Sequence, residues 1–168
     1  MKKFLILLAV TVLPLAGFAQ ASSGKVSKRK VASVISQYKN KAGVDVVDLG
    51  WLGTSLLKGL VRYSDADDED TRQALMMMKG LKGISLMSYD ESDPSLKARI
   101  TSHLEKALKG AELLMEVKDE GEKVRIYGTS DEKSGKVRDV AVFAPSDGTF
   151  IFLSGSFNLE DISKIMDK

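Results

Sequence analysis

Cysteine is absent from all 168 residues of this chain. Without cysteine there are no disulfides, no thiol nucleophile and no thiolate ligands for zinc or iron–sulfur clusters. A lipid anchor on an exported bacterial protein also requires a cysteine at the signal cleavage site. The sequence therefore predicts a product that is released without a lipid anchor.

Histidine occurs only once, as His103. A zinc site built on imidazole needs a second histidine, and a Ser–His–Asp unit needs a serine that some motif marks out, which the sequence does not provide. No Walker or dinucleotide-binding glycine pattern is present either. We interpret His103 as a structural residue at the rim of an apolar helix stripe, and we predict no enzymatic activity and no cofactor.

Only one long apolar run is present, at residues 4–18, between two lysines and a group of small residues. This is the layout of a secretory signal peptide. The 15 apolar residues are fewer than the about 20 that span a bilayer. We expect residues 1–19 to be removed after Ala19, with cleavage after Ala21 as the alternative. The mature chain should be periplasmic or secreted and have no transmembrane segment.

The exported part also lacks an excess of charge. The whole chain has 25 basic and 23 acidic residues, and two of the lysines belong to the signal. A protein that neutralises many phosphates needs a basic surface. The balanced charge therefore argues against nucleic acid as a partner.

The rest of the chain predicts a flexible lead-in at residues 20–30 and a single domain at residues 31–168. Apolar spacing and capping residues predict helices at 31–43, 54–63 and 94–109, and from Asn158 onward. They also predict a short helix that starts near Thr71 and ends at Gly80 or at Gly83. Alternating runs predict strands at 44–49, 84–89, 112–118, 122–128, 137–144 and 149–156. Hairpin turns join the last four strands, which favours an α+β class with a mainly antiparallel sheet and helices packed against it.

Three segments carry a family resemblance: GISLMSYDESDP, ELLMEVKDEGEKVRIYG and VRDVAVFAPSDGTFIFLSGSFNLEDISKI. Together with the order of elements over residues 26–166, they resemble the bacterial family catalogued as domain of unknown function 4252. The segments are patterns of packing and turns without a catalytic signature. The resemblance implies an exported protein of Gram-negative bacteria with no assigned activity.

Five carboxylates crowd into residues 65–70. Asp65, Asp67 and Glu69 match the first three ligand positions of an EF-hand, but Asp70 replaces the required glycine and a methionine replaces the closing glutamate. Two interpretations remain. The carboxylates form a weak, irregular calcium site, or they solvate a loop ahead of the positive end of a helix that starts near Thr71.

Two other signals for binding are weak. Trp51 stands between glycines, where it presents an aromatic face to a ligand such as a glycan or simply marks a strand-to-helix turn. Met76–Met78, with Met87 and Met115, have the thioethers that copper(I) prefers. Adjacent helical residues point about 100° apart, so we interpret these methionines as core and contact residues.

We therefore expect an exported, non-enzymatic interaction or accessory domain of the bacterial cell envelope, which presents a sheet face or a cleft to an envelope protein. One alternative is a ligand- or calcium-binding module that uses Trp51 or the acidic stretch. Another is a regulatory partner in envelope signalling. The largest apolar patch and the largest pocket of the folded domain should distinguish these hypotheses.

Overall fold

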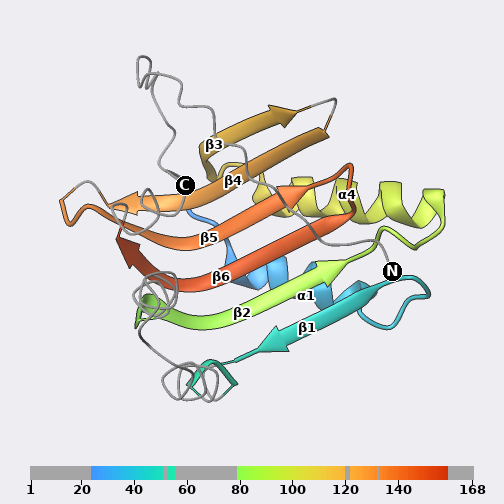
Figure 1. The fold of residues 1–168 in the computed structure, drawn as a ribbon, viewed down its shortest axis with the longest axis horizontal. Helices are drawn as coiled ribbons and strands as arrows, with labels where there is room; N and C mark the ends of the chain where they lie inside the picture. The colour runs from blue at the N-terminus through green and yellow to red at the C-terminus, as the bar shows by residue number, and fades with distance from the viewer. Residues whose placement is uncertain (1–23, 51–52, 56–78, 120–121, 132, 159–168) are drawn as a thin grey trace, which may run out of the picture.

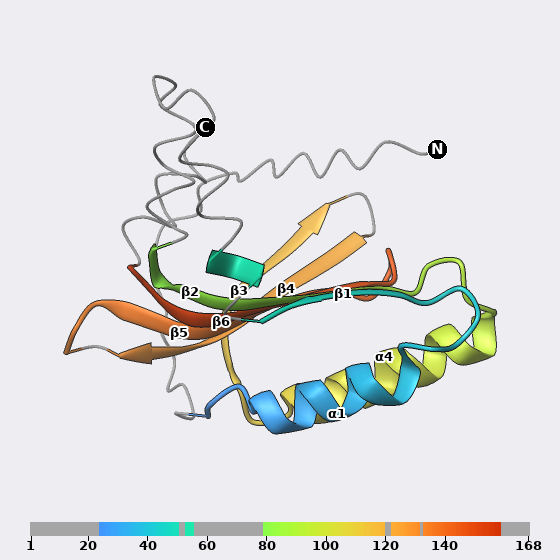
Figure 2. The same ribbon diagram turned by 90° about the horizontal axis from the view of Figure 1, so that it is seen from below.

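The computed structural model describes residues 24–50, 53–55, 79–119, 122–131 and 133–158. Within these ranges, six strands form one sheet, and two long helices lie against one of its faces (Figure 1, Figure 2). In chain order the elements are α1 (Lys28–Tyr38), β1 (Asp45–Leu49), β2 (Leu81–Ser88), α4 (Pro94–Leu108), β3 (Glu112–Asp119), β4 (Glu122–Asp131), β5 (Lys136–Ala144) and β6 (Thr149–Asn158). The predicted C-terminal run of four strands and the broad α+β class are confirmed.

The strand order is β1-β2-β6-β5-β4-β3, and every neighbouring pair is antiparallel. Hairpins join β3 to β6 in sequence, whereas β6 also pairs with β2, which lies far away in the chain. The β5–β6 turn contains Gly148 at φ 58°, and the Tyr89 amide donates to the Gly148 carbonyl over 2.7 Å. The described edges of the sheet are therefore β1 and β3.

Helix α1 begins at Lys28 because the Ser27 side chain accepts a hydrogen bond from the Lys30 amide. The prediction that the helix starts at Val31 after a flexible lead-in is wrong by three residues, and Val26 is already buried. The sequence did not predict this start, because cations in the first turn are unfavourable near the positive end of a helix. The predicted buried stripe is present: Val31, Val34, Ile35 and Tyr38.

Helix α4 begins where the sequence predicts. The Asp93 carboxylate accepts hydrogen bonds from the Ser95 and Leu96 amides, and Pro94 occupies the first turn. These contacts satisfy amides that have no partner within the helix. After the helix, Gly110 adopts φ 85°, which L side chains rarely adopt.

The sheet settles the residue at which β2 begins. Of the two helix ends that the sequence allows, Gly80 and Gly83, the structure agrees with Gly80, because Leu81–Gly83 belong to β2. There the backbones approach closely: a Cβ on Gly155 would lie 2.1 Å from the Gly80 carbonyl oxygen. Asn158 is the last residue of β6, where it pairs with Lys136. The predicted last helix, and most of those that start at residues 54 and 71, lie outside the described residues.

Side chains from both faces of the sheet are buried. The helix-side core centres on Met87, Tyr89, Phe143 and Phe150, which pack with residues of α1 and α4. The opposite face carries a smaller cluster, formed by Leu81, Val137, Val140 and Phe157. A bulge at Asp139, with φ 51°, brings Val137 and Val140 to the same face although they are three positions apart.

Candidate functional site

Charge is distributed unevenly between the helices and the sheet. We define the helical layer as residues 24–44 and 94–109, which contain ten basic side chains and one carboxylate, Glu105. Glu105 lies 3.5 Å from Arg125 of β4, and Lys97 pairs with Asp90 over 2.6 Å. The other cations of the helical layer form no ion pair with the described part of the chain. The layer is therefore strongly positive although the chain beyond residue 19 is balanced.

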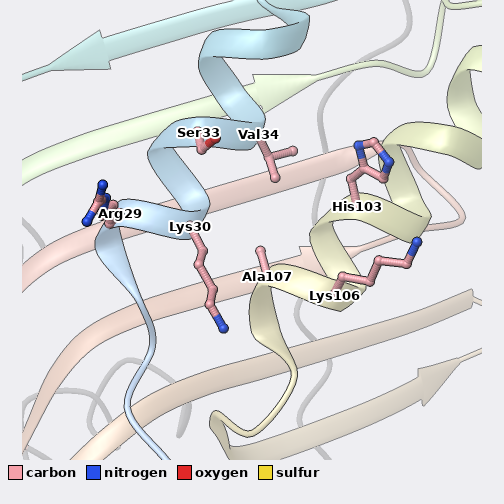
Figure 3. Close-up of a pocket in the computed structure, with 7 residues that line it drawn as sticks. All are labelled: Arg29, Lys30, Ser33, Val34, His103, Lys106 and Ala107. Carbon is pink, nitrogen blue, oxygen red and sulfur yellow. The ribbon is translucent and has the colours of Figure 1, made fainter.

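A groove of about 400 Å³ lies between α1 and α4. The lining residues are Arg29, Lys30, Ser33 and Val34 from α1, and His103, Lys106 and Ala107 from α4 (Figure 3). We call these seven residues the basic groove. Val34 and Ala107 are buried and form its apolar floor, while the three cations are exposed at its rim.

The two helices run antiparallel, which brings the cations together. The Glu112 amide, just after α4, donates to the carbonyl of Gly24, just before α1. The first turn of α1 with Arg29 and Lys30 therefore lies beside the last turn of α4 with Lys106. Lys106 suits the negative end of its helix, whereas the cations on the first turn of α1 oppose the positive end.

His103 contacts Tyr38 across the two helices. The Tyr38 hydroxyl and His103 Nδ1 are 2.8 Å apart, and the ring centroids are 5.6 Å apart. Tyr38 is only 2% exposed, so its hydroxyl depends on this partner. The contact supports the structural interpretation of His103, because the imidazole ties α4 to α1 at the wall of the basic groove.

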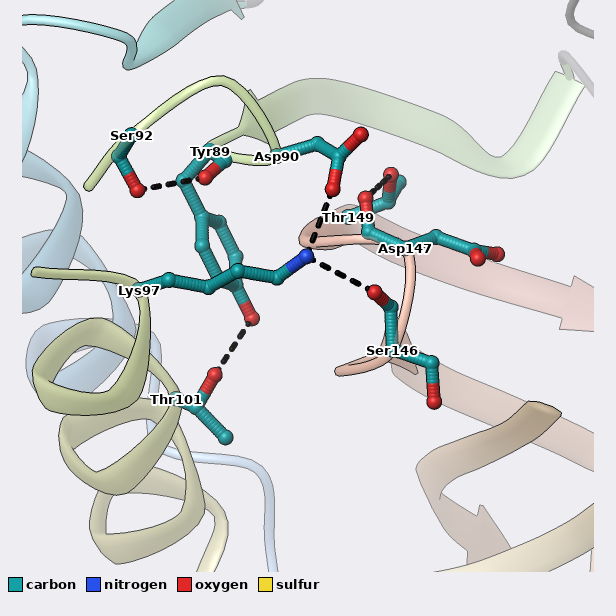
Figure 4. Close-up of polar contacts among 8 residues, drawn as sticks. All are labelled: Tyr89, Asp90, Ser92, Lys97, Thr101, Ser146, Asp147 and Thr149. Atoms are coloured by element: carbon teal, nitrogen blue, oxygen red, sulfur yellow. Dashed lines mark hydrogen bonds and ion pairs between the residues drawn. The ribbon is translucent and has the colours of Figure 1, made fainter. Parts of the chain in front are cut away.

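A polar network fixes α4 against the sheet (Figure 4). The Tyr89 hydroxyl lies 3.2 Å from Thr101 Oγ1, and burial raises the pKa of Tyr89 above its usual value of 10.0. Lys97 Nζ donates to the Asp90 carboxylate and to the Ser146 carbonyl over 2.6 and 2.9 Å. These contacts connect α4 to the end of β2 and to the β5–β6 turn, so they help to hold one wall of the basic groove in place.

A second groove of about 330 Å³ lies on the other side of α1, against β1 and β2. Lys28 and Lys82 contribute cations to it, but Asp48 lies among them and accepts a hydrogen bond from Ser85 over 2.8 Å. Charge of both signs lines this second groove, so it presents a weaker field than the basic groove.

The residues that the sequence singled out for binding lie elsewhere. Trp51, the acidic residues Asp65, Asp67 and Glu69, and Met76–Met78 fall outside the described residues, so the ligand and calcium hypotheses stay predictions. Met87 is fully buried in the helix-side core, which confirms its interpretation as a core residue. Across the described ranges, no three His, Asp or Glu side chains gather as metal ligands, and no helix has the length and apolar character to cross a membrane.

Sequence reasoning missed the basic groove. The net charge of the chain is balanced and gave no sign of a local positive charge. Residues 24–44 nevertheless contain six basic residues and no acidic residue. That local excess is the signal that could have found Arg29 and Lys30. The pairing with Lys106 required the fold, because the two helices are separated by more than 50 residues.

A family model described as domain of unknown function (DUF4252) matches residues 38–165. The match confirms the resemblance predicted from the sequence. It covers the sheet and α4, while nearly all of α1, with Arg29 and Lys30, precedes it. No curated protein and no solved structure matches the chain.

Proposed function

Since this chain belongs to the DUF4252 family, whose description assigns no activity, we propose its function from its own residues. It is a non-enzymatic interaction domain that is exported to the bacterial cell envelope and binds an anionic component there through the basic groove. The observation that carries this proposal is the concentration of cations without ion-pair partners in the described part of the helical layer.

Export is supported by residues 1–19, which have the charged, apolar and small-residue regions of a signal peptide. Export also bears on the choice of partner. The balanced total charge predicted no nucleic-acid partner. That argument no longer applies, because the positive charge is concentrated in the helical layer. The prediction now depends on export, which separates the protein from nucleic acid inside the cell.

A binding role without catalysis is supported by the chemistry of the groove. Its side chains are three cations, a hydroxyl, an imidazole and two apolar groups. The imidazole Nδ1 is committed to Tyr38, and the chain contains no cysteine nucleophile. Cations at the rim of an apolar groove recognise negative charge, which is sufficient for docking.

The proposal is tested by expressing the full chain in a Gram-negative bacterium and fractionating the cells. Mass spectrometry should find a mature N-terminus at Gln20 or Ser22. At low ionic strength the mature protein should sediment with the envelope, and high salt should release it, because exposed charges are screened within about 10 Å at moderate salt.

A charge-matched pair of variants assigns the binding to the groove. The groove variant Arg29→Gln/Lys30→Gln/Lys106→Gln removes three cations from the helical layer. The sheet variant Lys118→Gln/Lys133→Gln/Lys136→Gln removes three exposed cations from β3 and from the β4–β5 region. The groove variant should move to the soluble fraction, while the sheet variant should stay with the envelope. An uncleaved cytoplasmic protein, or equal losses in both variants, would refute the proposal.

A further inference from the structure

We infer that the anionic component is the surface of a phospholipid bilayer, with a headgroup phosphate held between Arg29, Lys30 and Lys106. This inference rests on the proposed function, because it names the partner of the same groove. It extends that function from a general preference for negative charge to one chemical class, the anionic phospholipids.

The basic groove has charged groups outside and apolar groups beneath them, an arrangement that is complementary to the headgroup region of a lipid. Arg29, Lys30 and Lys106 are exposed at the rim, where their long stems carry the charge outward. Val34 and Ala107 provide an apolar floor beneath them. A phosphate can therefore contact the cations while the carbon atoms of the glycerol lie against the floor.

The surface around the groove allows close approach to a plane. Helices α1 and α4 lie side by side on one face of the sheet, so both can meet the same flat surface (Figure 2). Several exposed positions near the cations carry small side chains, namely Ala32, Ser33, Ser36 and Ala98, although Gln37 and Glu105 are exposed as well. No bulky apolar side chain is exposed on either helix, so the attachment is electrostatic and reversible.

The charge on α1 supplies a driving force. Its first turn contains Lys28, Arg29 and Lys30 and no acidic residue. Each cation is unfavourable near the positive end of the helix, and the neighbouring Lys106 adds to the repulsion. An anionic surface relieves this repulsion, and each cation near such a surface strengthens binding by roughly fivefold.

An acidic peptide fits the groove less well than a lipid surface. Peptide recognition usually pairs backbone groups with a strand edge or fills a groove with apolar anchors. The basic groove contains no strand edge, and only Ser33 and His103 add polar groups to the three cations. Point charges around a small apolar floor suit a compact phosphate better than an extended chain.

The test uses mature protein recovered after export, with its N-terminus verified by mass spectrometry. Sedimentation with large unilamellar vesicles compares neutral phosphatidylcholine alone with phosphatidylcholine that contains phosphatidylglycerol. We expect binding only to the vesicles with phosphatidylglycerol, and dissociation as the salt concentration is raised. The groove variant should lose at least about tenfold in affinity, since three cations each contribute roughly fivefold. The sheet variant should stay within about twofold of the unmodified protein.

Circular dichroism and thermal unfolding of both variants show whether a loss of binding results from a loss of folding. Both variants should remain folded, because all six substituted residues are exposed. Inorganic phosphate and a DNA oligonucleotide serve as competing probes at matched ionic strength. Binding to either probe without binding to vesicles would overturn the lipid assignment. Equal losses in both variants would also overturn it. Failure on vesicles combined with groove-dependent, salt-sensitive association with cell envelopes would overturn the lipid assignment and leave the proposed function intact.

Discussion

The two faces of the sheet are both apolar but are built differently. On the helix side, Tyr89, Phe143 and Phe150 are 0% exposed. On the opposite side, Val137 is also fully buried, but its neighbours Val142 and Leu153 are only partly buried. Aromatic residues and Met87 under two helices thus form the main core, while the smaller cluster consists of aliphatic residues and one aromatic residue, Phe157. The helix-side face should therefore dominate the free energy of unfolding.

The largest expected effect tests this difference with two neighbouring residues on β5. Phe143→Ala should lower the free energy of unfolding by about 3–5 kcal/mol, because a large cavity opens beside Phe150. Val142→Ala, on the opposite face, should cost about 1 kcal/mol. Urea denaturation of both variants measures the contrast, and equal losses would show that the two faces are packed alike.

On the opposite face, the backbone should be more sensitive than the side chains. Gly155→Ala should cost about 2–4 kcal/mol, since its Cβ would lie 2.1 Å from the Gly80 carbonyl oxygen at φ 148°. Gly110→Ala is the control, because Gly110 also has positive φ, at 85°, but has open space around it. Thermal unfolding should show a smaller loss for Gly110→Ala. A larger loss there would mean that backbone strain, rather than close approach, limits both sites.

Within the helix side, the contact between α1 and α4 should contribute a smaller amount. His103→Ala leaves the buried Tyr38 hydroxyl without its partner and should cost about 1–3 kcal/mol. A double-mutant cycle with Tyr38→Phe isolates the pair, because Tyr38→Phe should recover part of the loss. His103→Gln retains a polar side chain near the Tyr38 hydroxyl and should lose less stability than His103→Ala, measured by urea denaturation. Equal losses in both variants would contradict the role of this hydrogen bond.

Titration should give the smallest effects and should separate the two regions by pH. Because burial raises the pKa of Tyr89, its stabilising contribution is present below pH 10.0 and is lost as the pH rises through the raised pKa. The hydrogen bond from Lys123 lowers the pKa of Glu116 on β3, so its contribution is present above pH 4.5 and is lost as the pH falls through the lowered pKa.

The free energy of unfolding is measured as a function of pH in Tyr89→Phe and in Glu116→Gln. The comparison assigns the decrease at alkaline pH (the alkaline limb) and the decrease at acidic pH (the acidic limb) to these two residues. Tyr89→Phe should flatten only the alkaline limb, and Glu116→Gln only the acidic limb. The acidic change should be slight, because Glu116 is exposed and its ion pairs are screened by solvent. An unchanged alkaline limb in Tyr89→Phe would show that this hydroxyl does not control stability.

Local signals predicted the elements that local chemistry controls. Asp93 and Pro94 define the start of α4 through contacts within three residues. The hairpin turns similarly gave the four strands of the C-terminal run. Runs that are apolar on both faces marked β5 and β6 as interior strands, and each lies between two neighbours in the sheet.

Features that depend on contacts between residues far apart in the chain could not be predicted from the sequence. Nothing near Leu81 indicates that it pairs with Gly155 in the sheet, so the sequence leaves the end of the preceding helix open between Gly80 and Gly83. The basic groove depends in the same way on α1 and α4 meeting across the intervening strands. The sequence could identify each cation. Only the antiparallel packing of the helices showed that Arg29, Lys30 and Lys106 line the same groove.

The two edge strands have a consequence for behaviour at high concentration. Among the described residues, the exposed large apolar side chains are Val47 on β1 and Leu113 on β3. Each lies beside carboxylates of its own strand, Asp45 and Asp48 in one case and Glu112 in the other. Edge charges and the bulge after Leu113 discourage the addition of a strand from another molecule. We therefore expect the carboxylates of β1 to lower the tendency of the protein to form fibril-like assemblies at high concentration.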